Sequence, residues 1–192
     1  SGASSRLHEC WTPSYFSDKF GSLQVSLIDV RSALEFTSPL RAFYAGFARP
    51  HERPKPPRLA IASRAPSLAS PPGPPLLKLK DWPTSSDFAD LLPDHFADLM
   101  AALPQQDYTH RRGARNLACR LPAYALPPDL GPKMYVAYGT RGITTGEPEA
   151  LCLFGTTCLH MDMADAVNLC VFVQPAPAEE GGAEGGAAGG AE

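Results

Sequence analysis

The sequence lacks paired cysteines, a long apolar run and an excess of positive charge. Its five cysteines are an odd number and form no C-x-x-C pair, which argues against a disulfide framework and a zinc ribbon and favours reduced thiols in an intracellular protein. No apolar run approaches the roughly 18 residues of a membrane span, and no basic-then-apolar N-terminus indicates a secretory signal. The formal charge of -3 predicts no direct nucleic-acid binding, which would require a cationic surface.

Two stretches of the 192 residues are poor in residues that build a core. Residues 50–75 contain nine prolines, which cannot donate the backbone hydrogen bonds of a helix or an interior strand, and residues 178–192 contain only Gly, Ala and Glu. The chain is therefore expected to be one globular domain with a flexible insertion at 50–75 and a disordered tail at 178–192. Its folded parts are an N-terminal part at 1–49 and a core at 76–177.

The regular elements follow from caps and from hydrophobic periodicity. Thr12-Pro13 begins a short helix that Gly21 ends, and Ser38-Pro39 begins a second helix. In that second helix Leu40 and Phe43 start an apolar stripe with helical spacing. Alternating or continuous apolar runs predict strands, and a stripe before Pro104 predicts another helix. The expected elements are helices at 13–20, from 39 onward and at 94–103, and strands at 23–30, 76–83, 134–138 and 159–173.

His160 and Asp162 are the strongest candidates for a metal site. Side chains on a strand alternate between its two faces, so His160 and Asp162 project to one side while Met161 and Met163 pack behind them. An imidazole and a carboxylate are two of the three ligands of the facial triad that holds non-haem Fe(II) and leaves positions open for substrate and oxygen. The spacing therefore predicts two ligands of one metal ion.

Several further blocks lie in order along the chain. They are residues 9–11, 77–83, 96–108, 116–118, 120–122, 128–135, 137–139 and 155–168. Together they resemble a jumonji C (JmjC) domain, in particular the group of demethylases that act on lysine 9 of histone H3 and include the hairless-related enzymes. The resemblance covers about residues 8–174, apart from the proline-rich segment and the loop 140–153.

The resemblance implies a fold, a reaction and partners. The fold is mainly β with flanking helices (α+β), a double-stranded β-helix of the cupin-like jelly-roll type, here incomplete. The implied reaction uses Fe(II), 2-oxoglutarate and oxygen to hydroxylate an N-methyl group of lysine, and the resulting hemiaminal releases formaldehyde. The implied partners are the histone H3 tail and chromatin-associated complexes, and the implied location is the nucleus.

The resemblance also assigns roles around the metal. His160 and Asp162 match the first two iron ligands, Thr157 matches a residue that hydrogen-bonds the distal carboxylate of 2-oxoglutarate, and Asn168 matches a position near the cosubstrate. Strand parity alone places Thr157 opposite His160, so its role requires a bend or bulge.

The tyrosines before the metal block, and some charged residues, have two interpretations each. Tyr135 and Tyr138 either line a pocket for the methylammonium group or are ordinary barrel aromatics. Asp165 either pairs with a base or caps a turn. The basic residues around Arg111 either meet an acidic partner or form a solvated loop, and Trp82 is expected in the core.

Two residue types that relatives use are missing from the later sequence. The family's third iron ligand is a histidine on a later strand, yet no histidine follows His160, and the family's cosubstrate lysine has no match because no lysine follows Lys133. We therefore expect the N-terminal half of a JmjC domain, with little or no demethylase activity of its own. The alternatives are a non-catalytic JmjC remnant that acts as a binding module in a chromatin complex, and zinc held by Cys152 or Cys158 with His160 and Asp162.

Overall fold

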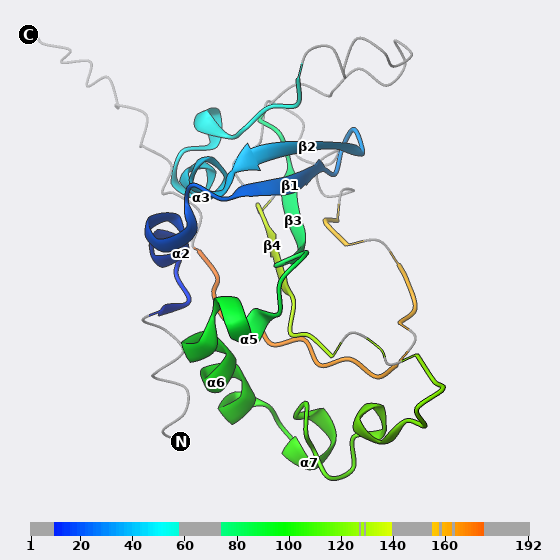
Figure 1. Ribbon diagram of the computed structural model, residues 1–192. Helices are drawn as coiled ribbons and strands as arrows, with labels where there is room; N and C mark the ends of the chain where they lie inside the picture. Colours follow the sequence, from blue (N-terminus) through cyan, green and yellow to red (C-terminus); the bar gives the residue numbers. More distant parts are fainter. Residues whose placement is uncertain are drawn as a thin grey trace, which may run out of the picture.

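A four-stranded antiparallel sheet organises the chain (Figure 1). The computed structural model describes residues 10–57, 74–126, 128, 130–139, 155–157, 159–162 and 164–174. The strands are β1 (Gln24–Asp29), β2 (Leu34–Pro39), β3 (Leu77–Trp82) and β4 (Met134–Ala137), in the order β2-β1-β3-β4. Helices accompany the sheet, so the predicted α+β class is confirmed.

The helices begin where the sequence supplies caps. The Thr12 hydroxyl accepts a hydrogen bond from the Tyr15 amide at the start of α2, and the Asp87 carboxylate accepts one from the Ala89 amide at the start of α5. None of the helices in the described ranges is both long and apolar enough to cross a membrane. The helices are α2 (Pro13–Phe20), α3 (Leu40–Ala48), α5 (Phe88–Leu91), α6 (Pro93–Ala102) and α7 (Gln106–Thr109), with 3-10 turns at Pro50–Glu52 and Leu117–Arg120.

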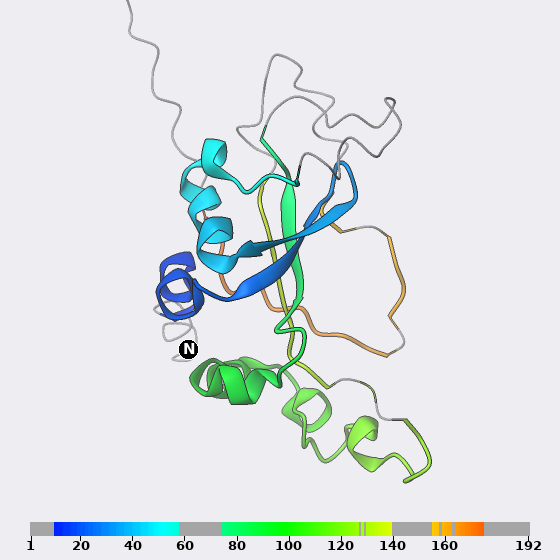
Figure 2. The same cartoon turned by 45° about the horizontal axis from the view of Figure 1, so that its top comes forward.

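One face of the sheet is covered by α2 and α3. Leu27, Leu79 and Val136 lie opposite one another on adjacent strands, so they share this face. Phe16 of α2 and Phe43 of α3 pack against the same buried cluster, and Trp82 belongs to it as expected. Helices α6 and α7 extend away from the sheet beyond one end of β3 (Figures 1 and 2).

The opposite face of the sheet carries Ile28, Lys78 and Ala137, which are also in register. In both views the start of the later segment, residues 155–162, lies on this side, away from α2 and α3 (Figures 1 and 2). Residues 164–174 then run past the end of the sheet, and Val171 packs against the core. The segment that carries His160 and Asp162 is therefore on the side of this second face, which α2 and α3 leave open and which is called the open face below.

The prediction of a strand at 159–173 was wrong for the described part of that range, which contains no strand. Apolar side chains do occur at every second position there, at Val167, Leu169 and Val171, as in a strand with one buried face. A strand also needs hydrogen bonds from a neighbouring strand, and none of the described strands pairs with this segment. The edge strand β2 and the four-residue helices α5 and α7 were not predicted.

Arg53 connects the beginning and the end of the proline-rich segment. Its guanidinium is buried, and it donates hydrogen bonds to the carbonyl oxygens of Gly46 and Pro75, each at 3.2 Å. It also lies 4.1 Å from the centroid of the Tyr138 ring. Residues 58–73 and 175–192 lie outside the described residues, so the flexible insertion and the disordered tail stay predictions.

Removing the Tyr138 hydroxyl tests how the sheet is joined to α3. That hydroxyl donates to the backbone oxygen of Phe43, and burial raises the pKa of Tyr138 well above its usual range, so the phenol stays protonated. Tyr138→Phe is expected to lower the free energy of unfolding by about 1 kcal/mol, because it leaves a buried carbonyl with one donor fewer. Urea denaturation measures the change. Tyr135→Phe is the control, since Tyr135 is 62% exposed, and an equal loss in both variants would contradict the prediction.

Candidate metal and substrate site

The structure brings His160 and Asp162 together. Nε2 of His160 lies 3.7 Å from Oδ1 of Asp162, and both side chains are exposed, at 59% and 56%. The two residues are outside any strand, so their proximity comes from the local path of the chain and not from the strand alternation that predicted it.

The geometry fits two neighbouring ligands of one divalent ion. Ligand atoms about 2.1 Å from an ion, at right angles to one another, are about 3 Å apart, so a shift of less than 1 Å brings this pair to that spacing. Nitrogen and carboxylate oxygen are a donor set that suits iron. Within the described ranges no three His, Cys, Asp or Glu side chains gather closely enough to hold a metal. The zinc alternative depends on Cys152 and Cys158, which lie outside the described residues.

The candidate cosubstrate residues flank the metal pair along the chain. Thr157 is exposed at the end of the described stretch 155–157, and Asn168 is exposed on the segment 164–174. The chain bends at Thr156 and Thr157, outside any strand, and the cosubstrate role of Thr157 stays a prediction. The exposure of both residues leaves their polar groups available to a ligand.

Lys78 connects this segment to the sheet, a contact that was not predicted from the sequence. Its Nζ atom donates a hydrogen bond to the Thr156 carbonyl oxygen at 2.9 Å. Lys78 lies in β3, and in the sequence it is one of two lysines in an alternating strand pattern. Such a pattern predicts a side chain on the polar face of a strand, but it does not predict the distant residue that the side chain reaches.

The two candidate substrate tyrosines lie apart. Tyr138 is only 1% exposed, and its ring stacks on Phe43 at 4.8 Å between centroids, which favours the core interpretation for this residue. Tyr135 is exposed and shares its face of the sheet with Ala137 and Lys78 by strand alternation. The structure therefore leaves Tyr135 on the side of the sheet where residues 155–162, called the metal segment below, begin. It does not bring the two tyrosines together.

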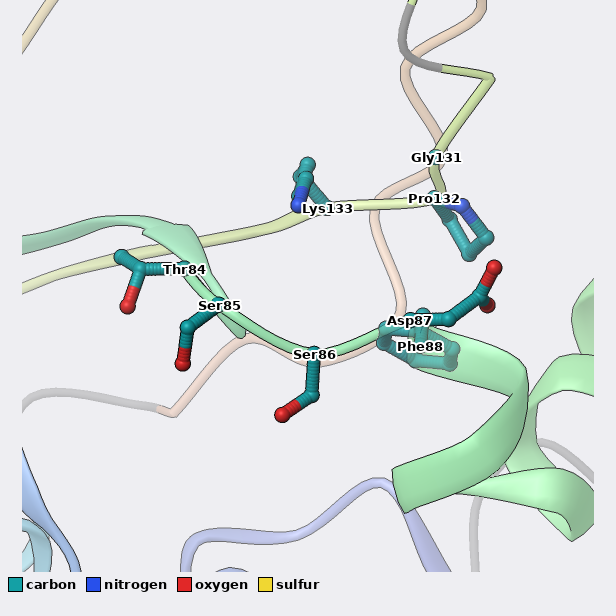
Figure 3. Close-up of a pocket in the computed structure, with 8 residues that line it drawn as sticks. All are labelled: Thr84, Ser85, Ser86, Asp87, Phe88, Gly131, Pro132 and Lys133. Atoms are coloured by element: carbon teal, nitrogen blue, oxygen red, sulfur yellow. The ribbon is translucent and has the colours of Figure 1, made fainter.

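A polar pocket of about 300 Å³ lies between the loop before α5 and the segment before β4 (Figure 3). Its charged groups have partners within the fold. Lys133 donates from Nζ to the Pro83 carbonyl oxygen at 2.9 Å, and Asp87 binds Arg111. No candidate ligand of the metal or cosubstrate lines it. The lining residues are Thr84, Ser85, Ser86, Asp87, Phe88, Gly131, Pro132 and Lys133.

Arg111 forms a structural ion pair and is not simply part of a solvated loop. Its two terminal nitrogens bind the two oxygens of Asp87 at 2.9 and 2.6 Å, and its guanidinium lies 5.4 Å from the Phe96 ring centroid. The Arg111 hydrogen bonds, and then the Ala89 amide, lower the pKa of Asp87 to about 2. This pair connects the start of α5 to the chain after α7.

Replacing Asp87 tests this connection. Because its folded pKa is below the ordinary value of 3.8, the carboxylate stabilises the fold above about pH 4, and that contribution is lost as the pH falls toward 2. Asp87→Ala is expected to cost about 1 kcal/mol, mostly from the lost helix cap, since more than a third of the side chain is exposed and the ion pair is screened. Thermal denaturation at pH 7 and at pH 2.5 measures it. Asp87→Asn, which keeps the capping oxygen, should cost less than Asp87→Ala. If Asp87→Ala lowers the stability by the same amount at pH 7 and at pH 2.5, the ion pair makes no contribution.

Comparison with known proteins finds relatives that are demethylases. No protein-family model matches it. The curated proteins that it resembles are lysine-specific demethylases, and one of them carries the JmjC domain in its name. The predicted resemblance is therefore confirmed at this level, while the histone site stays a prediction.

The individual relatives come from vertebrates and an insect. The chain is 41% identical over 175 residues, 90% of its length, to Lysine-specific demethylase 3A of Homo sapiens. It is 42% identical over 166 residues to Lysine-specific demethylase 3 of Drosophila melanogaster, and 31% identical over 163 residues to Probable JmjC domain-containing histone demethylation protein 2C of Homo sapiens, covering 86% and 85% of this chain. The chain spans only 12%, 17% and 6% of these three relatives.

Proposed function

We propose that the chain is part of the catalytic domain of a JmjC histone lysine demethylase that uses Fe(II) and 2-oxoglutarate. The observation that carries the proposal is 41% identity to a lysine-specific demethylase over 90% of the chain. The substrate is a methyl-lysine of the histone H3 tail, lysine 9 by resemblance to the hairless-related group. The corresponding location is the nucleus, in chromatin-associated complexes that regulate transcription.

In this proposal the residues of the metal segment bind and orient. The imidazole nitrogen of His160 and the carboxylate of Asp162 hold the iron, which supplies the activation of oxygen when it is bound. The Thr157 hydroxyl donates a hydrogen bond to the distal carboxylate of 2-oxoglutarate, and the Asn168 amide contacts the same cosubstrate. Tyr135, exposed on the open face, is the remaining tyrosine candidate for the methylammonium group.

The sheet supports an incomplete jelly roll as the proposed fold. A double-stranded β-helix consists of two antiparallel sheets that face each other around the site. The sheet β2-β1-β3-β4 has one face covered by helices, and the metal segment starts on the side of the other face. This is the arrangement expected of one wall of such a fold.

A non-catalytic binding module is the second candidate function. The exposure of His160 and Asp162, together with the absence of a third ligand among the described residues, favours it. Two protein ligands open to water hold iron weakly, so the segment would then serve to contact a chromatin partner instead of a metal.

An assay of the native protein that carries this chain distinguishes the two candidate functions. It is purified and incubated with trimethyl-, dimethyl- and monomethyl-lysine 9 peptides of histone H3, Fe(II) and 2-oxoglutarate, and mass spectrometry follows the methyl groups while a formaldehyde assay follows the product. Loss of methyl groups that requires both Fe(II) and 2-oxoglutarate supports the demethylase. Binding of the peptides without any methyl loss supports the binding module, and lysine 4 peptides test the histone site.

A further inference from the structure

Lys78 occupies a central position on the open face of the sheet. It lies in β3, where it is paired with Ile28 of β1 on one side and Ala137 of β4 on the other. Its side chain is partly buried, and its ammonium group donates to the Thr156 carbonyl oxygen at 2.9 Å. This bond connects an interior strand to the segment that carries the metal pair, 78 residues later in the chain.

We propose that Lys78 is a positioning residue for the metal site. Its ammonium group fixes the bend at residues 155–157, and through that bend it orients Thr157, His160 and Asp162. The inference rests on the proposed function, because it assigns Lys78 to the same site. Lys78 does not touch the metal, and its effect passes through the backbone of Thr156.

The physical reason is the high exposure of the metal segment. His160 and Asp162 are more than half exposed and lie outside any strand, so a sheet ladder does not hold them. A hydrogen bond from a charged donor is stronger than one between neutral groups, and burial of part of the lysine stem shields it from water. Groups that hydrogen-bond metal ligands directly typically change metal affinity by about 10- to 100-fold when they are removed, so Lys78, which acts through the backbone, is expected at the lower end of that range.

Lys80, two residues further along the same strand, provides a matched control. Its side chain is 54% exposed, and it pairs with its neighbour Asp81 at 3.4 Å. The two lysines have the same charge and the same strand, but they differ in the group that they reach. A general effect of charge on the site would therefore appear in both variants, whereas positioning would appear only at Lys78.

The test compares Lys78→Met, Lys78→Arg and Lys80→Met in the native protein that carries this chain. Amide hydrogen exchange of residues 155–162 is measured without metal, and Mn(II) affinity is measured by electron paramagnetic resonance. For Lys78→Met we expect about 10-fold faster exchange and about 10-fold weaker Mn(II) binding, with kcat at saturating Fe(II) within about 3-fold of the unmodified protein. Lys78→Arg keeps a charged donor and should recover most of both properties, and Lys80→Met should change neither.

The outcomes separate this inference from the proposed function. Unchanged exchange in Lys78→Met overturns the connection whether or not metal binds, and faster exchange with unchanged Mn(II) affinity overturns the positioning role. If the unmodified protein binds no Mn(II), the proposed function fails and the positioning role fails with it. If the unmodified protein binds Mn(II) and Lys78→Met equals it, only this inference fails.

Discussion

His160→Ala and Asp162→Ala are each expected to reduce 2-oxoglutarate turnover by more than about 100-fold in the native protein that carries this chain. Each substitution removes one of the two adjacent metal ligands and leaves the ion with too few protein donors. The fold should remain intact, because both side chains are exposed and contribute nothing to the core. The rate of 2-oxoglutarate consumption and the circular dichroism spectrum together measure the effect.

His51→Ala is the matched control for this experiment. His51 is also an exposed histidine, at 78%, but it lies 3.6 Å from Glu52 at the start of the proline-rich segment. Its removal should leave turnover unchanged. Undiminished turnover in either His160→Ala or Asp162→Ala would remove the metal assignment, and an equal loss in His51→Ala would indicate a nonspecific effect of the substitution.

Phe16→Ala is expected to be the most damaging of these changes to the fold, at about 3–5 kcal/mol of the free energy of unfolding. Phe16 is only 2% exposed at the inner face of α2. Such a loss is a large fraction of the stability of an ordinary domain. Its ring contacts six aromatic side chains, namely Trp11, Tyr15, Phe20, Tyr44, Trp82 and His95.

The measurement for Phe16→Ala is urea denaturation of this chain followed by tryptophan fluorescence. Its two tryptophans, Trp11 and Trp82, both contact the Phe16 ring, so their emission reports the packing directly. Phe172→Ala is the control, because Phe172 is 38% exposed and lies outside the sheet. Its loss should stay below about 1 kcal/mol, and a similar loss in both variants would mean that Phe16 is not central to the core.

The sequence predicted the elements whose causes are local. The cap at Thr12-Pro13 and the apolar stripe that begins at Leu40 gave α2 and α3 close to their observed bounds. Strands β1 and β3 followed from runs of apolar residues whose burial alternates. In each case the residues that form the element also carry the signal for it, so a short window of sequence was sufficient.

The features that depended on distant partners were not predictable in this way. The segment 159–173 has the alternation of a strand but pairs with no described strand. Strand β2 was not predicted, because its last two residues, Ser38 and Pro39, were interpreted only as the start of α3. The predicted neighbours His160 and Asp162 do lie together, but the contact from Lys78 to Thr156 spans 78 residues and has no local signature.

Arg53 also affects how this region of the chain can change over evolutionary time. By donating to the carbonyls of Gly46 and Pro75, it brings the two ends of the intervening residues to one point of the fold. Once the ends of a loop are fixed, doubling its length costs only about 0.6 kcal/mol in closure entropy. Insertions and deletions between Arg53 and Pro75 should therefore be tolerated. Replacement of Gly46 should not be tolerated, because a Cβ atom there would clash with the Tyr138 hydroxyl and would lie 2.8 Å from Cγ of Arg53. A single buried side chain thus predicts both a region of variable length and a constant base.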